Sequence, residues 1–259
     1  MRAATAIRTI AERELLRYVR DRGRVFVTVF QPLMFLVVFG SGLRSSLARS
    51  SFGVDYISFM YPGTVAMSIM SVSFFSTIST VWDREFGFLK EIMVAPVSRT
   101  SIALGKTFGA AIIAMSQGLL LLCFAPLVGI SLRPQVIPAA LVIMLLLASA
   151  TAGIGLLVAS LVRTVENFGV IMNLLVFPMF FLSGAFFPLT AVPTWMKIVS
   201  SANPMAYGVD ALRQMLLAPT AGSGLMPLLL HPASLDALYL LAFSSVFVSC
   251  AVLAFSRRD

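Results

Sequence analysis

The fold is decided by a charged interruption between two long apolar runs, residues 81–99, which reads VWDREFGFLKEIMVAPVSR. This interruption is dense in charge, yet it carries five large apolar side chains: Phe86, Phe88, Leu89, Ile92 and Met93. An apolar ridge on an otherwise polar segment usually marks a surface that binds another molecule. In the alternative interpretation, the ridge rests on lipid head groups and the charges only hold the topology.

The composition places the chain in a membrane. Of its 259 residues, 59% are hydrophobic and 12% are charged, whereas soluble domains carry about 25% charged residues. The net charge of +8 fits the bias of Lys and Arg toward the cytoplasmic side of membrane proteins, so no nucleic-acid partner is expected. Cys123 and Cys250 lie in apolar runs and are expected to be small buried hydrophobes. His231 has no cysteine or carboxylate cluster beside it and is expected to be a solvated loop residue.

Apolar segments of about 20 residues are long enough to cross a bilayer as helices. The chain has six such segments, so an all-α integral membrane fold with six transmembrane helices is predicted in one domain, residues 1–259. The spans are residues 25–43, 56–81, 102–127, 136–162, 168–186 and 236–255. Of the 19 Lys and Arg residues, 14 fall on the side that holds both termini and the loop 82–101, and this places both termini in the cytoplasm.

Two further regions lie outside these spans. Residues 1–24 contain seven arginines and predict an N-terminal amphipathic interfacial helix, although Glu14 interrupts its apolar face. The alternative is a merely charged tail. Residues 187–235 are cut by six prolines into pieces too short to cross the membrane, and they predict short re-entrant helices between spans five and six.

No source of chemical energy is recognisable in the chain. Leu104-Gly105-Lys106-Thr107 contains the end of a phosphate-binding loop, but the glycine required five positions before Gly105 is Thr100. No nucleophile–base pair or carboxylate pair stands at a plausible spacing either. We therefore expect no catalytic residues, no cofactor and no metal in this chain.

Several short motifs stand at matching positions along the chain. Besides residues 83–91 and 95–99, they are Gln31-Pro32-Leu33, Tyr61-Pro62-Gly63, Ser183-Gly184-Ala185-Phe186-Phe187-Pro188, Asn203-Pro204-Met205 and Val209-Asp210-Ala211-Leu212-Arg213. Together they resemble the permeases of type-2 ABC exporters, most closely the daunorubicin-resistance and nodulation-factor subgroup. The resemblance covers about residues 10–256.

This resemblance implies a permease subunit of the cytoplasmic membrane that moves an amphipathic drug, lipid or glycoconjugate. Its implied partners are two separate ABC ATPase subunits, which would carry ATP and Mg, and a second permease that is either a copy of this chain or a sister chain. Residues 82–101 would be the coupling loop, with a short helix from Asp83 to Val94 ended by Pro96. The implied coupling residues are Glu85, Gly87, Phe88, Leu89, Glu91, Ile92, Met93 and Pro96.

A substrate path is predicted from uncharged polar and aromatic residues within an apolar wall, because such a wall suits amphipathic cargo. The candidates are Asn173, Phe177, Phe180, Ser183, Asn203 and Tyr207. Asp210 and Arg213, three residues apart, are expected to pair locally. Two other functions remain open: a self-contained channel or ion-coupled carrier, which would need ionisable residues at membrane depth, and a scaffold or intramembrane enzyme, which lacks a catalytic constellation.

Overall fold

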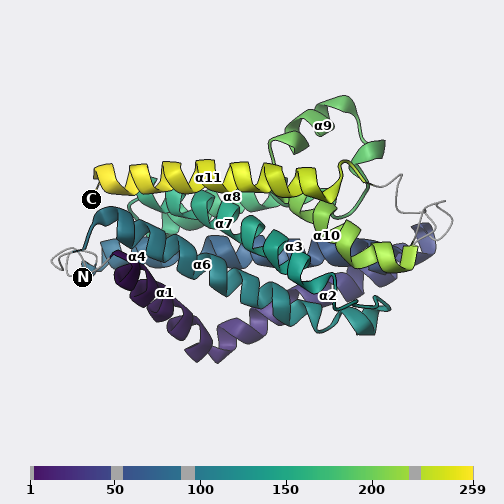
Figure 1. The fold of residues 1–259 in the computed structure, drawn as a ribbon, viewed down its shortest axis with the longest axis horizontal. Coiled ribbons are helices and arrows are strands. Elements are labelled where there is room, and N and C mark those ends of the chain that lie inside the picture. Colours follow the sequence, from purple (N-terminus) through teal and green to yellow (C-terminus); the bar gives the residue numbers. More distant parts are fainter. Residues whose placement is uncertain (1–2, 48–54, 89–96, 222–228, 259) are drawn as a thin grey trace.

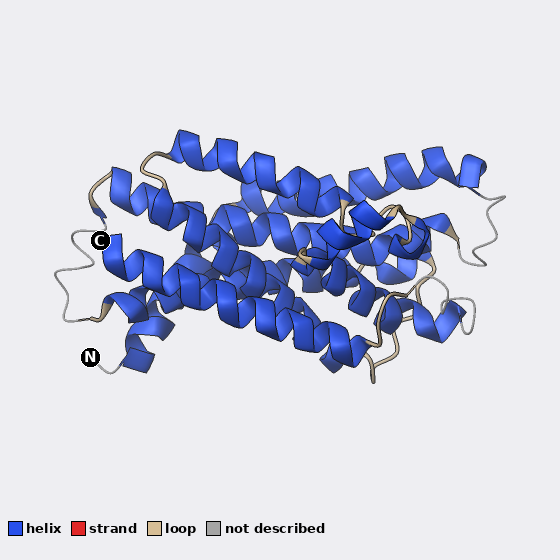
Figure 2. Ribbon diagram, turned by 90° about the horizontal axis from the view of Figure 1, so that it is seen from above, coloured by secondary structure: helices blue, strands red, loops and turns tan. Residues whose placement is uncertain are grey.

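The computed structural model describes residues 3–47, 55–88, 97–221 and 229–258, and these residues form helices and no strands (Figure 2). The helices are α1 (Ala3–Arg20), α2 (Arg22–Leu47), α3 (Tyr56–Ser76), α4 (Ile78–Glu85), α6 (Arg99–Leu122), α7 (Ile137–Leu161), α8 (Val165–Phe181), α9 (Thr194–Ser201), α10 (Pro204–Ala221) and α11 (Ala233–Arg258), with 3-10 turns at Ala125–Val128 and Leu189–Ala191. The predicted all-α fold is confirmed.

Within the described residues, five helical stretches are long and apolar enough to cross a membrane: residues 22–42, 56–85, 99–122, 137–161 and 233–257. The remaining predicted span, the fifth (residues 168–186), corresponds to α8, a shorter apolar helix of 17 residues. The predicted count of six spans is compatible with this arrangement. The region 187–235, predicted to form short helices, contains α9 and α10.

The long helices run along a common direction, and both ends of the chain lie at the same end of the bundle (Figure 1). We call this the termini end, and it also holds α4 and the beginning of α6. The opposite end, called the far end, holds α9, α10 and the beginning of α11.

The centre of the bundle is α3, whose Val65, Ile69 and Phe74 are fully buried. Small residues let its neighbours approach closely, as is common between membrane helices. A Cβ atom on Gly155 of α7 would lie 2.6 Å from the Thr77 hydroxyl, and one on Gly118 of α6 would lie 2.8 Å from Ile69. Helix packing here therefore depends on the absence of side chains.

The N-terminal helix α1 packs against protein. A Cβ on Gly105 of α6 would lie 2.9 Å from the Ile10 Cβ, so the backbones of the two helices nearly touch. The buried Tyr18 hydroxyl donates to the Gln117 side-chain oxygen (3.1 Å), and burial raises the pKa of this hydroxyl, which keeps it a neutral donor. The arginines of α1 remain exposed. Helix α1 thus has one face docked on α6 and one basic outer face.

Three of the sequence motifs meet at the far end. A Cβ on Gly63 would lie 2.5 Å from the Ala185 Cβ, so the Tyr61-Pro62-Gly63 motif packs directly on the turn at residues 183–188. Gly184 in that turn has a φ of 76°, which favours glycine. The Arg213 guanidinium donates to the Gly184 carbonyl (2.7 Å) and lies 4.0 Å from the centre of the Phe59 ring.

Two predictions about single residues are wrong. Cys123 and Cys250 are exposed, because they lie on outward faces of the bundle that a membrane would cover. Asp210 and Arg213 do not serve mainly as a local pair. The Asp210 carboxylate accepts hydrogen bonds from the backbone N–H groups of Leu230 and His231, while Arg213 bonds the carbonyl of Gly184.

Candidate functional site

The coupling segment begins on a helix that continues α3. After a break at Thr77 the chain forms α4, which ends at Glu85. Gly87 follows with a φ of 82°, and its N–H donates to the Arg84 carbonyl (3.2 Å). The predicted helix from Asp83 to Val94 is therefore wrong in its first part. Asp83 lies in the last full turn of α4, and the left-handed Gly87 ends the helix where the sequence predicts its continuation.

Asp83 is part of a buried ionic cluster. Its carboxylate lies 2.6 Å from the Lys106 ammonium, which also lies 3.5 Å from the Glu14 carboxylate. All three residues are less than 10% exposed, and the half-exposed Arg13 reaches Asp83 at 3.5 Å. The cluster joins α1, α4 and α6. Lys106, which resembles the lysine of a phosphate loop in sequence, lies inside α6 and holds two carboxylates.

The next two residues, Arg84 and Glu85, bridge the turn between α7 and α8. Arg84 donates to the carbonyls of Ala159 and Val162 at the C-terminus of α7 (2.8 and 2.9 Å). Glu85 accepts from the N–H of Val165 at the N-terminus of α8 (3.0 Å). Each charge has the sign that the adjacent helix dipole favours. Glu85 is also exposed, and its predicted role at the contact with an ATPase stays a prediction.

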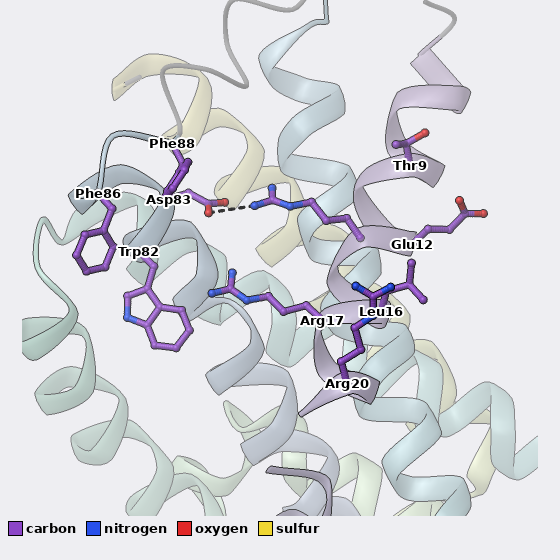
Figure 3. A pocket seen from close by; sticks show the side chains of 10 residues that line it. Thr9, Glu12, Leu16, Arg17, Arg20, Trp82, Asp83, Phe86 and Phe88 are labelled. Atoms are coloured by element: carbon purple, nitrogen blue, oxygen red, sulfur yellow. Dashed lines mark hydrogen bonds and ion pairs between the residues drawn. The ribbon is translucent and has the colours of Figure 1, made fainter. Parts of the chain in front are cut away.

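Beyond Glu85 the surface becomes apolar. Phe86 is 70% exposed and Phe88 is 54% exposed. Together with Trp82 they border an open groove of about 990 Å³ between α1 and α4, which we call the α1–α4 groove (Figure 3). Its other wall is basic, and the Arg17 guanidinium lies 5.2 Å from the centre of the Trp82 ring. An apolar edge beside an exposed basic face is typical of an interaction surface.

A second candidate site is a cavity of about 500 Å³ between α2, α3 and α8. It is mostly apolar, with a few hydroxyl and amide groups on its wall. The lining residues are Arg24, Thr28, Gln31, Pro32, Phe35, Met67, Ser68, Ser71, Val72, Phe75, Asn173, Val176, Phe177 and Phe180. The buried Ser68 hydroxyl has no hydrogen-bond partner among the described residues. This composition suits a ligand with both an apolar and a polar part.

Comparison with known proteins identifies the family. The family described as ABC-2 type transporter matches residues 5–217. The chain belongs to the ABC-2 transporter family. Nodulation protein J of Rhizobium meliloti (strain 1021) is 32% identical over 224 residues, which cover 86% of this chain and 82% of the relative.

Two other relatives are also described as permeases. The putative transport permease ycf38 of Cyanophora paradoxa is 32% identical over 71% of this chain, which spans 65% of the relative's length. The inner membrane transport permease YadH of Escherichia coli (strain K12) is 24% identical over 80% of this chain and 81% of its own length. The chain is accordingly a multi-pass membrane protein and a transport subunit of the ABC-2 type.

The predicted site residues of this ABC-2 permease fall into three groups. Asn173, Phe177 and Phe180 line the cavity together, and Glu85, Gly87 and Phe88 lie at the end of α4. The remaining predicted coupling residues lie outside the described part of the chain: Leu89, Glu91, Ile92, Met93 and Pro96. Their contact with an ATPase stays a prediction.

The third group comprises the other predicted path residues, Ser183, Asn203 and Tyr207. They do not line the cavity and instead hold the far end together. The Ser183 hydroxyl donates to the Phe180 carbonyl (2.6 Å). The Asn203 side chain donates to the Met179 carbonyl (2.6 Å) and accepts from the Met205 N–H (3.0 Å). The Tyr207 hydroxyl donates to the Ser201 carbonyl (2.8 Å).

The partners of the buried charged residues at both ends of the molecule could not be predicted from the sequence. Residues 14, 83 and 106 are far apart in the chain, and no local spacing links them. The one available signal was the position of Glu14 on the otherwise apolar face of α1. A charge on a buried helix face requires a partner of opposite sign nearby, and the structure supplies it in Lys106.

Proposed function

We propose that this chain is the membrane subunit of an ATP-driven exporter and that separate ATPase subunits, which carry ATP and Mg, drive its conformational change. The observation that supports this most directly is the end of α4. Its exposed aromatic side chains stand on a segment that is bonded to four other helices. A partner that pushes on such a segment moves several helices together.

The bonds of α4 indicate how the force would be distributed. Asp83 connects the segment to α6 and to α1, Arg84 connects it to the end of α7, and Glu85 connects it to the beginning of α8. Helix α8 carries Asn173 and Phe177, which line the cavity. A displacement of α4 therefore changes the position of one cavity wall relative to α2 and α3, as expected for two alternating arrangements of the helices.

The substrate class follows from the cavity. Its wall is apolar over most of its area, and its few polar groups are hydroxyls and amides, apart from Arg24 at one end. We expect an amphipathic drug, lipid or glycoconjugate there. Apolar side chains on α2 and α8, such as Phe26, Val37, Val170 and Leu174, are exposed. These faces suit a second permease, either a copy of this chain or a sister chain, that would complete the path.

The coupling role is tested by replacing both Phe86 and Phe88 with Asp and purifying the tagged chain from its native membranes. The expected result is a loss of more than about ten-fold in co-purifying ATP hydrolysis, because charges now occupy the apolar contact. The control is Trp195→Asp, since Trp195 is a similarly exposed aromatic residue (62%) on α9 at the far end. The control should retain ATP hydrolysis.

Undiminished ATP hydrolysis in the Phe86→Asp, Phe88→Asp variant would contradict the coupling role of this surface. Gradient-driven flux through the chain reconstituted alone in liposomes would contradict the whole proposal, because a self-contained channel or carrier needs no ATPase. A thermal unfolding curve for each variant separates loss of the partner from loss of the fold.

A further inference from the structure

Three ionisable side chains meet at the far end, although they stand apart in sequence. Asp210 belongs to α10, His231 precedes α11, and Asp236 lies in the first turn of α11. One imidazole nitrogen and one oxygen from each carboxylate all lie within 4.8 Å of one another. The prediction of a solvated histidine without a carboxylate cluster is therefore wrong, because the packing of α10 on α11 assembles this cluster.

The cluster contains unused ligand atoms. Asp236 is fully buried, and its Oδ1 has no hydrogen-bond partner among the described residues. This oxygen lies 3.5 Å from the His231 Nδ1, which likewise lacks a hydrogen-bond partner there. A buried carboxylate oxygen without a donor is unfavourable in a protein interior. A cation between the two atoms would satisfy both.

The surrounding groups hold the three side chains in place. The Gln214 amide donates to the other oxygen of Asp236 (3.3 Å) and to the His231 carbonyl (2.8 Å). Asp210 accepts from the backbone N–H groups of Leu230 and His231 (2.9 and 3.1 Å). The imidazole ring packs against the rings of Tyr207 and Tyr239, with centres 5.8 and 5.7 Å away. Outer contacts of this kind orient the ligands of metal sites.

We propose that Asp210, His231 and Asp236 form a site for a divalent transition-metal ion of the zinc class. One imidazole nitrogen and two carboxylate oxygens are three protein ligands of the types that Zn²⁺ accepts, with a fourth position open to water. The imidazole argues against Mg²⁺ and Ca²⁺, which prefer oxygen ligands. The His231 side chain is 36% exposed, so an ion can reach the cluster from the surface.

The consequence of binding is a cross-link. The ion would join α10, the segment before α11, and α11 itself at the end of the molecule away from both termini. Because α10 also holds the turn at Gly184 through Arg213, the cross-link would fix the far end of the bundle. This site does not depend on the proposed ATPase coupling, which involves the opposite end.

The test uses the full chain, purified in detergent, treated with EDTA and desalted. Calorimetric titration with ZnCl₂ should give one strong site per chain, and a hundred-fold excess over the Kd should raise the Tm by about 5 to 10 °C. The same titration with MgCl₂ should give no strong site. Asp236→Asn and His231→Gln should each weaken zinc binding at least about ten-fold, whereas Glu166→Gln, which changes an exposed carboxylate elsewhere, should leave it unchanged.

Two results would overturn the site. One is the absence of strong zinc binding to the wild-type chain, and the other is equal zinc binding by the wild type and both cluster variants. If the wild type does not bind zinc and Asp236→Asn raises the Tm of the EDTA-treated protein, the carboxyl groups of Asp210 and Asp236 share a proton and bind no metal. His231→Gln keeps the test valid if Asp236→Asn does not fold, because the His231 side chain is partly exposed.

Discussion

The two ends of the molecule both contain buried charged side chains, but they use them differently. At the termini end the Lys106 ammonium stands between the carboxylates of Asp83 and Glu14, so charges of opposite sign face each other. At the far end two buried carboxylates lie beside one partly exposed histidine. The first arrangement places a buried lysine between its two carboxylates, whereas the second places a partly exposed histidine beside them; one carboxylate oxygen lacks a hydrogen-bond partner among the described residues in each, on Glu14 and on Asp236.

This difference indicates how each end is held together. The termini end also has close helix contact and charged side chains on backbone groups, and it adds buried ion pairs between helices that are distant in the sequence. The far end is joined by close backbone contact, with Gly63 against Ala185, and by charged side chains that bond to backbone groups. We therefore expect the termini end to be sensitive to the removal of charge and the far end to be sensitive to changes of shape.

The largest effect is expected for Lys106→Met. This change leaves Glu14 buried without a cation and Asp83 with only the half-exposed Arg13, and breaking a buried pair in this way costs about 3–5 kcal/mol. Thermal unfolding of the purified chain should show a large drop in Tm. Adding Asp83→Asn and Glu14→Gln should recover part of the loss, and Lys197→Met, at an exposed lysine on α9, should have little effect. Equal Tm values for the two lysine variants would contradict the expectation that the termini end is the one sensitive to removal of charge.

An intermediate effect is expected for Gly63→Ala at the far end. The new Cβ would lie 2.5 Å from the Ala185 Cβ and 2.7 Å from its Cα, which is closer than side chains pack. Overpacking of this kind costs about 1–3 kcal/mol. The second substitution Ala185→Gly should restore part of the Tm. The control is Gly169→Ala in α8, where a Cβ meets nothing within 4 Å. A Gly63→Ala variant as stable as this control would show that shape does not govern the far end.

The smallest effect is expected for Glu85→Gln. The amide oxygen keeps the hydrogen bond to the Val165 N–H, so only the attraction between the negative charge and the N-terminus of α8 is lost, about 0.3–1 kcal/mol. Amide hydrogen exchange in the first turn of α8 should become faster. Glu12→Gln changes an exposed carboxylate on α1 and should leave this exchange unaltered. Slower exchange in the Glu85 variant would contradict the bridge between α4 and α8.

Much of the fold could be predicted from local patterns. The apolar runs predict the long helices, and the prolines between residues 187 and 235 predict the short ones, because both signals act within a few turns of one helix. The cavity residues Asn173, Phe177 and Phe180 were predicted from their chemistry, as polar and aromatic groups within an apolar wall, and all three lie on α8 and line the cavity. Asn203 and Tyr207 were assigned to the path although their side chains bond backbone carbonyls, of Met179 and of Ser201, which sequence alone does not reveal.

The sequence by itself determined that the chain is a helical membrane protein of the permease type, because composition and motif order are properties of the chain. Only the tertiary structure decided the partners of its charges. Glu14 meets Lys106 because α1 packs on α6, and Asp210 meets His231 and Asp236 because α10 packs on α11. Burial then decides the role of each charge. A buried charge beside a charge of opposite sign forms an ion pair, whereas a buried carboxylate oxygen that lacks a hydrogen-bond donor is available to a ligand.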